Sequence, residues 1–305
     1  MNSKRCAFLS MDNPDDFVID DELAYEPLRR LKWEVETVSW RAQVNWDLYD
    51  LVIIRSPWDY QNAPDEFLRV LDKITHSSAE LQNPLPLVRW NLDKRYLREL
   101  ETRGIPIVPT CWGENANDLH EASIHAWYGQ LSTPELIIKP VISANADHTY
   151  RVPYNQRLEL LPMLQDVFRN RAFMVQPFVP SVLEEGEFSL FYFAGEYSHA
   201  ILKTPKENDF RVQEEHGGYI RGVQPSEKLR QQADAAMEVL PASPLYARVD
   251  FVRLPKANTT EHFVVMEFEL IEPALYLRMD EGAPARFANA INNFNTVDAW
   301  MARMY

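Results

Sequence analysis

Three carboxylates near the end of the chain have the types and spacing that could bind a metal ion. The segment 246–277 contains two runs rich in Val, Phe and Tyr, YARVDFVRL and HFVVMEFEL, separated by the polar PKANTTE. This arrangement predicts a β-hairpin. If the hairpin is symmetric about residues 258–259, Asp250 faces Glu267. Because side chains alternate between the faces of a strand, Glu269 shares the face of Glu267. The pattern therefore places three acids on one face of a hairpin whose other face is apolar.

Acids this close together favour a bound cation. Like charges disfavour each other's ionised forms unless a cation neutralises them. The apolar runs FVVM and IEPALYL on either side indicate partial burial, where unpaired acids are costly. Mg²⁺ takes oxygen ligands and is usually shared with substrate phosphates. We therefore expect Asp250, Glu267 and Glu269 to bind Mg²⁺; the alternative is an acidic strand face exposed to solvent.

Four cationic residues could hold the anionic partner of such a metal. Lys139 ends the apolar run ELIIKP and Lys203 ends AILKTP, so each amine would point into a cleft at a strand end. Arg211 lies in the charged segment NDFRVQEEHGG, and Lys94 lies within a predicted helix. Taken singly, each is more simply explained as a solvated charge. Together with the carboxylates they form the two halves of a Mg-triphosphate site.

The first 80 residues read as a small open α/β domain. The strands KRCAFLSM, EVETVSW and DLVIIR accompany helices expected near 21–32 and 64–75, and DLVIIR is apolar throughout, as a buried parallel strand should be. Ligands of such sheets bind at the carboxyl ends of the strands. We expect Arg55 to anchor a substrate carboxylate there through its forked guanidinium; the alternative is an interdomain salt bridge. The same edge carries further candidate substrate-binding residues, namely Ser56, Trp58 and Tyr60.

The rest of the chain reads as α+β. The prolines of LQNPLPLV indicate a linker, and a helix follows with Asn91 as its N-cap and Gly104 beyond its end. Strands are expected at IPIVPT, ELIIKPV, TYRV and FMVQPFV, and helices near 119–128 and over NQRLELLPMLQDVFRN. FSLFYFAGEYSHAILK predicts a hairpin that turns at residues 194–195. Ser226 caps a further helix, and ARFANAINNF forms the last one.

Composition excludes several classes of function. The 305-residue chain has a net charge of −14, which argues against a nucleic-acid backbone or an anionic membrane as partner. No apolar run approaches membrane-spanning length. Cys6 and Cys111 form no CxxC pattern, so we expect a reducing cytoplasm. GxGxxG, GxxxxGK[ST], GxSxG and HExxH are all missing from the sequence. A bound nucleotide must therefore be held by lysines and strands in place of a glycine loop.

The order of these motifs resembles the ATP-grasp superfamily. Lys94, IIKP, VQPFV with LEEGE, LKTP…FRVQEEHGG, RVDFV and MEFELIEP follow one another over residues 89–277. The chain is most similar to the branch of bacterial glutathione synthetase and the cycloserine-forming cyclo-ligase; its N-terminal part matches more loosely, through VIIRSPWDY. The resemblance implies an N-terminal open α/β (pre-ATP-grasp) domain over 1–88, a central and lid subdomain over 89–176, and a C-terminal antiparallel-sheet subdomain with the metal hairpin over 177–305.

The resemblance also implies a role for each motif. Lys94 and Lys139 would hold the ATP phosphates, and Glu187 would take the ribose hydroxyls. Arg211 would hold the γ-phosphate and the acyl-phosphate, acting in catalysis with Lys139. The remaining ATP-binding residues would be Ser143, Gln176, Pro177, Phe178, Val179 and Lys203, with the segment 176–179 along the adenine. Asp250, Glu267 and Glu269 would bind two Mg²⁺ ions, for which Mn²⁺ could substitute. His216, Gly217 and Gly218 would join the residues near position 55 in binding substrate.

Two departures from the family pattern are visible. The lid loop is usually glycine-rich but reads SANADHT here, so Ser143, Thr149 and backbone N–H groups would have to contact the phosphates. Glu269 stands where the glutathione branch has Asn, and the added charge suits Mg²⁺.

The implied activity is that of an ATP-dependent ligase. ATP would phosphorylate a small-molecule carboxylate, and an amine or related nucleophile would capture the acyl-phosphate, with amino acids among the candidate substrates. One alternative is a non-catalytic ATP-binding regulatory protein of the same fold, and another is a ligase that modifies a peptide or protein. The sequence leaves open the two substrates, whether the product is a dipeptide, an amide or a ring, and whether the protein is a homo-oligomer.

Overall fold

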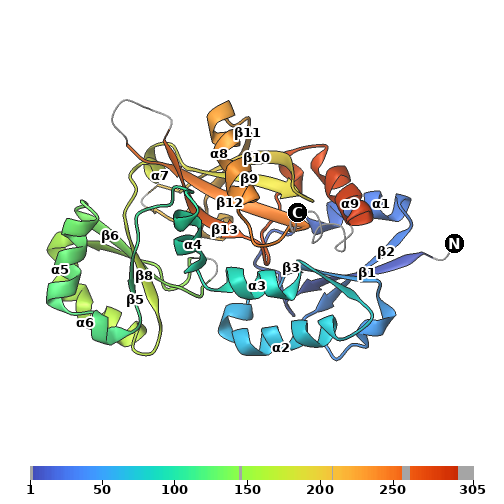
Figure 1. Ribbon diagram of the computed structural model, residues 1–305, viewed down its shortest axis with the longest axis horizontal. Helices are drawn as coiled ribbons and strands as arrows, with labels where there is room; N and C mark the ends of the chain where they lie inside the picture. Colours follow the sequence, from blue (N-terminus) through green and yellow to red (C-terminus); the bar gives the residue numbers. More distant parts are fainter. Residues whose placement is uncertain (1–2, 144–145, 208, 256–261, 295–305) are drawn as a thin grey trace.

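The computed structural model describes residues 3–143, 146–207, 209–255 and 262–294. Within these ranges the strands form three sheets, one each in the N-terminal, middle and C-terminal parts of the chain. Figure 1 shows the middle part as a separate lobe, while the N-terminal and C-terminal parts lie against each other. In the part of the chain that the structure covers, no helix is long and apolar enough to cross a membrane.

The N-terminal sheet is parallel, with the order β2-β1-β3-β4. Its strands are β1 (Lys4–Ser10), β2 (Trp33–Ser39), β3 (Leu51–Ser56) and β4 (Glu80–Gln82). Its helices are α1 (Tyr25–Arg30) and α2 (Pro64–Thr75). All six residues of β3 are buried, which confirms the interpretation of DLVIIR as a buried parallel strand. The helix expected near 21–32 is divided, because a 3₁₀ turn (η1, Asp21–Ala24) precedes α1.

The predicted linker LQNPLPLV is wrong, because this stretch contains β4 and the helix α3 (Leu85–Leu92). Its two prolines occupy the N-cap and the first turn of α3, where no backbone N–H is required for the helix. The single helix expected after it is also wrong, since α3 ends at Leu92 and α4 (Tyr96–Thr102) begins after a break. Asn91 is therefore no N-cap. Its buried amide donates to Phe268 O (3.0 Å) and accepts from Leu270 N (2.9 Å), which fixes α3 to the end of the carboxylate hairpin.

The middle lobe is an antiparallel sheet covered by two helices. Its strands are β5 (Cys111–Gly113), β6 (Glu135–Pro140), β7 (Tyr150–Pro153) and β8 (Phe173–Pro177), in the order β5-β8-β6-β7. The helices α5 (Glu121–Gln130) and α6 (Arg157–Val167) pack on it around a core that includes Ile124, Leu164 and Phe168. The predicted strand IPIVPT makes only one bridge, between Ile107 and Val265. Its two prolines lack the N–H groups that a longer ladder needs.

The C-terminal sheet is antiparallel, with the order β11-β10-β9-β12-β13. Its strands are β9 (Glu187–Phe193), β10 (Glu196–Thr204), β11 (Tyr219–Val223), β12 (Tyr246–Arg253) and β13 (Phe263–Glu269). The associated helices are α7 (Ser181–Glu184), α8 (Glu227–Glu238) and α9 (Ala283–Asn293). The predicted hairpin turn is confirmed, because Ala194 and Gly195 both have positive φ, as a tight two-residue turn requires. Asp250 pairs with Glu267, as the hairpin symmetry predicted; residues 258–259 themselves lie outside the described ranges.

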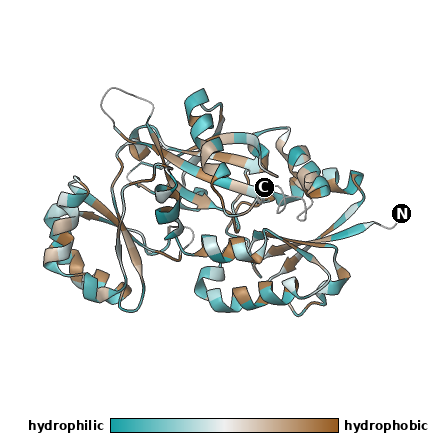
Figure 2. Ribbon diagram, in the orientation of Figure 1, coloured by the Kyte–Doolittle hydropathy of each residue, from teal (hydrophilic) through white to brown (hydrophobic). Residues whose placement is uncertain are grey.

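The N-terminal and C-terminal sheets share one hydrophobic core. Phe8 of β1, Tyr246 of β12 and Phe287 of α9 belong to the same buried cluster, and the Tyr246 hydroxyl donates to Ile54 O at 2.7 Å. Figure 2 shows the hydrophobic residues of both sheets on the strands, with polar residues on the outer faces of the helices. This shared core holds the carboxyl end of β3 close to the carboxylate hairpin. Short 3₁₀ helices complete the fold: η2 (Trp46–Leu48), η3 (Tyr60–Asn62), η4 (Ala116–Asp118), η5 (Tyr154–Gln156), η6 (Glu214–His216) and η7 (Leu277–Met279).

Candidate active site

One pocket collects residues from the N-terminal, middle and C-terminal parts of the chain. Trp58 and Tyr60 reach it from the N-terminal part, β6 and β8 from the middle lobe, and the carboxylate hairpin from the C-terminal sheet. The pocket brings together most of the predicted site residues: Lys94, Lys139, Ser143, Thr149, Gln176, Pro177, Phe178, Val179, Glu187, Lys203, Arg211, Asp250, Glu267 and Glu269. The two predicted halves, cationic and anionic, therefore line the same pocket, and some of their members form ion pairs with each other.

Two lysines lie beside Glu267. The Lys94 ammonium is 2.9 Å from Glu267 Oε1 and donates to Ser143 O at 2.7 Å. The backbone N–H of Lys94 donates to Val141 O (2.8 Å), which ties the start of α4 to the end of β6. Burial lowers the pKa of Lys139, and the nearby Glu267 carboxylate opposes that shift. An anionic ligand would therefore strengthen the charged form of Lys139.

Two aromatic residues, Phe178 and Phe210, lie in the pocket beside the end of β8. Phe178 packs edge-on against Phe210, with ring centroids 6.3 Å apart, and the guanidinium of Arg151 lies 3.9 Å from the Phe178 ring. The Phe178 N–H donates to Glu135 O (2.9 Å), and the Gln176 amide donates to Thr110 Oγ1 (3.1 Å). These contacts fix two aromatic rings, set edge to face, beside backbone groups of the segment 176–179, a combination that suits a purine ring.

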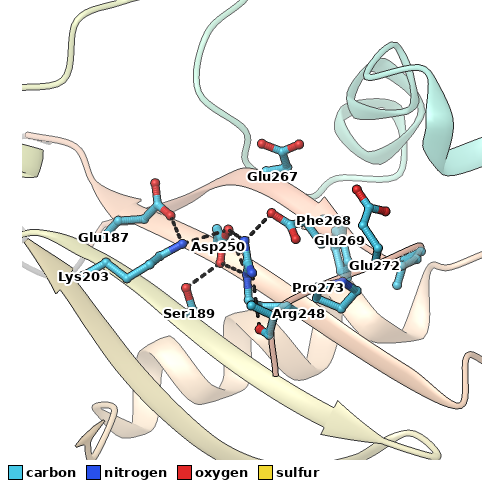
Figure 3. A network of polar contacts seen from close by, with 12 residues as sticks. Glu187, Ser189, Lys203, Arg248, Asp250, Glu267, Phe268, Glu269, Glu272 and Pro273 are labelled. Carbon is cyan, nitrogen blue, oxygen red and sulfur yellow. Dashed lines mark hydrogen bonds and ion pairs between the residues drawn. The ribbon is translucent and has the colours of Figure 1, made fainter. Parts of the chain in front are cut away.

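The carboxylates of the hairpin sit in a network with buried cations, shown in Figure 3. Asp250 accepts from Ser189 Oγ (2.6 Å) and pairs with Lys203 Nζ (3.2 Å) and Arg248 Nη2 (3.0 Å). Lys203 also pairs with Glu187 (2.5 Å), and Arg248 also pairs with Glu269. These contacts run across β9, β10, β12 and β13, so the centre of the sheet is a charged layer inside the pocket.

The electrostatics of this layer differ from one acid to the next. Burial would raise the pKa of Asp250, but Arg248 and Lys203 outweigh it and lower that pKa to about 2. For Glu269 burial prevails over Arg248, and its pKa rises to about 8. Burial likewise raises the pKa of Glu187, opposed by Lys203. The layer therefore contains acids that its own cations neutralise only in part.

The donor set fits Mg²⁺ by its chemistry. Asp250, Glu267 and Glu269 offer carboxylate oxygens in one pocket, and the raised pKa of Glu269 marks a buried acid in need of positive charge. Across the described ranges, however, no group of three or more His, Cys, Asp or Glu residues is close enough to hold a metal as it stands. Instead, Lys94 forms an ion pair with Glu267, and Arg248 forms one with Glu269. A bound Mg²⁺ would have to take over some of these cation contacts.

Sequence reasoning missed Arg248. It precedes Asp250 by two residues, so strand alternation puts the two on the same face of β12. Its side chain is buried and also donates to Ala274 O (3.4 Å). The signal was present in the run RVDFV, since an Arg between apolar residues on the inward face of a strand needs an acidic partner.

The expected role of Arg55 in substrate binding is wrong. Its side chain is 1% exposed, and the guanidinium pairs with Asp21 (3.0 Å), donates to Pro273 O (2.9 Å) and lies over the Tyr246 ring. The turn η1 supplies Asp21 and so covers the end of β3. Ser56 is equally buried and donates to Ser10 Oγ (3.0 Å). Both residues therefore fasten the N-terminal sheet; Arg55 forms a salt bridge, but with Asp21 of its own domain and not between domains, and its contact with the C-terminal part is the hydrogen bond to Pro273 O.

The remaining predicted substrate residues divide in two. Trp58 and Tyr60 line the pocket, as expected of that strand end. The described residues that line the pocket do not include His216, Gly217 or Gly218. Gln213, the N-cap of η6, and Glu215, within η6, line it instead. Arg211 does line the pocket and pairs with Asp209 (2.8 Å), which lowers the pKa of that acid.

Known proteins share both this sequence and this architecture. Residues 6–83 match the family model described as the N-terminal domain of D-cycloserine synthetase DcsG. The chain is 32% identical over 278 residues to the cycloserine biosynthesis protein DcsG of Streptomyces lavendulae, covering 87% of this chain and 90% of that protein. The chain belongs to the cycloserine synthetase family of ATP-grasp ligases.

Solved structures agree with that family. A crystal structure of D-cycloserine synthetase DcsG superimposes with a TM-score of 0.81 at 28% identity, covering 94% of this chain and 98% of that one. The ATP-grasp ligase PsnB, complexed with a phosphomimetic variant of its minimal precursor, Mg and ADP, shares the fold more distantly (TM-score 0.64, 13% identity, 95% and 98% covered). As a member of the cycloserine synthetase family, the protein is an enzyme, an ATP-dependent carboxylate–amine ligase.

Proposed function

We propose that this enzyme phosphorylates the carboxylate of a small amino-acid-like molecule with ATP and passes the acyl group to an amine. The observation that carries the proposal is that Lys94 and Lys139 line the same pocket as the layer of carboxylates and cations drawn in Figure 3. Its substrate end is closed by two nearly buried aromatic residues, Trp58 and Tyr60, which favours a small molecule over a peptide. When the amine and the carboxylate belong to one molecule, the same reaction closes a ring.

The nucleotide would occupy the side of the pocket nearest the middle lobe. The surface formed by Phe178 and Phe210 would hold the adenine, with backbone groups of the segment 176–179 along its edge. Lys94 and Lys139 would bind the phosphates, with Ser143 and Thr149 beside them. Glu187 would take the ribose hydroxyls and, in doing so, loosen its ion pair with Lys203.

Asp250, Glu267 and Glu269 would hold two Mg²⁺ ions, and Mn²⁺ would serve in their place. When bound, these ions supply positive charge to the transferring phosphoryl group. Arg248 and Lys203, released from part of their carboxylate contacts, would face the same phosphoryl oxygens. Arg211 would approach from its loop on the opposite wall. The cationic side chains already lie in the pocket, so little reorganisation is needed as charge develops.

A hydroxylamine trap tests this function. Enzyme, ATP and Mg²⁺ are incubated with hydroxylamine and a panel of carboxylates that includes D- and L-amino acids and aminooxy derivatives of serine. A reactive acyl-phosphate gives a hydroxamate and an equivalent of ADP only with an acid that fits. Cycloserine formed without hydroxylamine would identify the ring-closing reaction directly. ADP release that depends on an acid but never yields a hydroxamate would refute the acyl-phosphate route.

A further inference from the structure

Glu272 lies at the substrate end of the pocket, just beyond the carboxylate hairpin. Its backbone carbonyl accepts a hydrogen bond from Trp58 Nε1 (2.8 Å). Its side chain interacts with the hydroxyl of Tyr60, a hydrogen bond that favours the ionised carboxylate. Both aromatic residues come from the N-terminal part of the chain, and Trp58 is braced by Phe17, with ring centroids 5.1 Å apart. The position of Glu272 is therefore fixed by two independent contacts.

Glu272 differs from the other buried or partly buried acids of the pocket in its charge environment. Each of the others has a cation at ion-pair distance: Lys203 for Glu187 and Asp250, Lys94 for Glu267, and Arg248 for Glu269. Within the described parts of the chain, no Lys, Arg or His forms an ion pair with Glu272, and Figure 3 draws no polar contact between it and the rest of the network. Burial raises the pKa of Glu272 to about 7. Lys94 and Arg248 lower that pKa only from beyond ion-pair distance, so among the described residues no cation is in contact with this carboxyl group.

We infer that Glu272 binds the protonated amine that captures the activated carboxylate. A substrate ammonium supplies the missing charge, and Trp58 offers it an aromatic wall that also attracts cations. Charge-assisted hydrogen bonds of this kind are the strong ones, and more so inside a pocket. The inference rests on the proposed function, since it names the group that receives the second substrate at the same site.

The chemistry balances with Glu272 as the proton acceptor. The ammonium gives one N–H proton to the Glu272 carboxylate, and the freed lone pair attacks the carbonyl carbon of the acyl-phosphate. The C–N bond forms, and the C–O bond to phosphate breaks with its electron pair on the departing phosphate. The second proton leaves the nitrogen with that phosphate. Products are the amide, hydrogen phosphate and a protonated Glu272, which then loses its proton to solvent.

A competition experiment tests the inference with a defined probe. Hydroxylamine is largely neutral near pH 7.5 and needs no carboxylate to bind or deprotonate it. Hydroxamate formation is measured with increasing n-propylammonium, which has the charge of an amine substrate, and with 1-propanol, which has its shape alone. In the wild type, propylammonium should lower the hydroxamate yield and propanol should not. In Glu272→Gln, hydroxamate formation should persist, while about tenfold more propylammonium should be needed for the same effect.

Three comparisons keep the result interpretable. Glu215→Gln makes the same change at an exposed residue lining the same pocket and should behave as the wild type. Tyr60→Phe removes only the hydroxyl that faces Glu272 and should shift the propylammonium requirement in the same direction by a smaller factor. Melting temperatures of all variants confirm folding.

Three outcomes would overturn the assignment. Unchanged sensitivity to propylammonium in Glu272→Gln would show that the ammonium binds elsewhere. Loss of hydroxamate formation itself in a folded Glu272→Gln would place the residue in activation of the acid. A wild type that forms no hydroxamate with any acid would refute the acyl-phosphate, and this assignment along with it.

Discussion

Replacing Arg248 with methionine tests whether the buried charge layer is held together by the cation that a metal would displace. Arg248 is buried and joins Asp250 and Glu269, one on each strand of the carboxylate hairpin. Methionine has a similar length and no charge, so the variant removes the cation and leaves the acids. Asp250 keeps Lys203 and Ser189 as partners, whereas Glu269 loses its ion pair.

The size of the effect follows from these contacts. Removing one partner of a buried ion pair costs about 3–5 kcal/mol, because the remaining charge is left uncompensated. The partners that Asp250 retains place the cost near the lower end, about 3 kcal/mol. For a chain of this size each kcal/mol lowers the melting temperature by about 2–4 °C. We therefore expect Arg248→Met to melt about 6–12 °C below the wild type in metal-free buffer.

The assay is thermal melting with and without Mg²⁺ and a non-hydrolysable ATP analogue. A divalent cation replaces the missing charge, so the difference from the wild type should narrow when both are present. Arg29→Met serves as control, because Arg29 pairs with Glu26 on the surface and such pairs contribute about 0–1 kcal/mol. If Arg248→Met melts no lower than Arg29→Met, the layer is not stabilised by Arg248 and the electrostatic account of the site is mistaken.

The other predictions concern the metal, the phosphates and pH. Glu267→Gln should abolish ATP turnover and lower the melting temperature of the metal-free protein, because Lys94 and Lys139 lose the carboxylate that offsets their charge; full turnover would remove Glu267 from the metal site. Lys139→Ala should raise the KM for ATP or lower kcat strongly, and Lys73→Ala, on the polar face of α2, should change neither. Equal small effects of both substitutions would show that Lys139 does not bind the ATP phosphates. Glu269 has a folded pKa raised from 4.5 to about 8, so its contribution to stability is intact below pH 4.5 and is lost as pH rises toward 8. The metal-free wild type should therefore melt progressively lower across that window, and Glu269→Gln should flatten the decline; parallel curves would contradict the raised pKa.

The carboxylate face of the hairpin could be predicted from sequence, but the register shift between Asp250 and Phe251 could not, because alternation gives the faces of a strand and not its irregularities. Alternation along two apolar strands fixes which residues share a face, and the observed pairing of Asp250 with Glu267 agrees. Strand alternation also places Arg248 on the same face of β12 as Asp250, but the sequence prediction considered only the acids on that face. The prolines Pro84 and Pro86 led to a wrong prediction. They suggest an irregular linker, but they occupy the N-cap and the first turn of α3.

Arg55 shows what strand position alone leaves undetermined. The end of a parallel strand is where ligands bind, but whether a side chain there meets solvent depends on what covers it. Here η1 and the segment around Pro273 cover it, and both are distant in sequence. Glu272 was overlooked for the same reason, because its surroundings come from residues 58 and 60, more than two hundred positions earlier. The domain boundaries expected at 88/89 and 176/177, and the assignment of individual residues to ATP, stay predictions.

The chain enters and leaves the middle lobe through two strands that are neighbours. Cys111 of β5 pairs with Val175 of β8, and the lobe between them has its own core, whereas the other two sheets share one. The middle lobe is thus joined to the rest of the protein by two adjacent crossings, whereas the other two sheets are held together by a common core. A rotation of the lobe about these crossings would admit nucleotide and release product without changing the sheet that holds the carboxylates. It follows that turnover limited by product release would respond to substitutions in the crossing at 108–111, which contains none of the residues assigned to ATP or substrate.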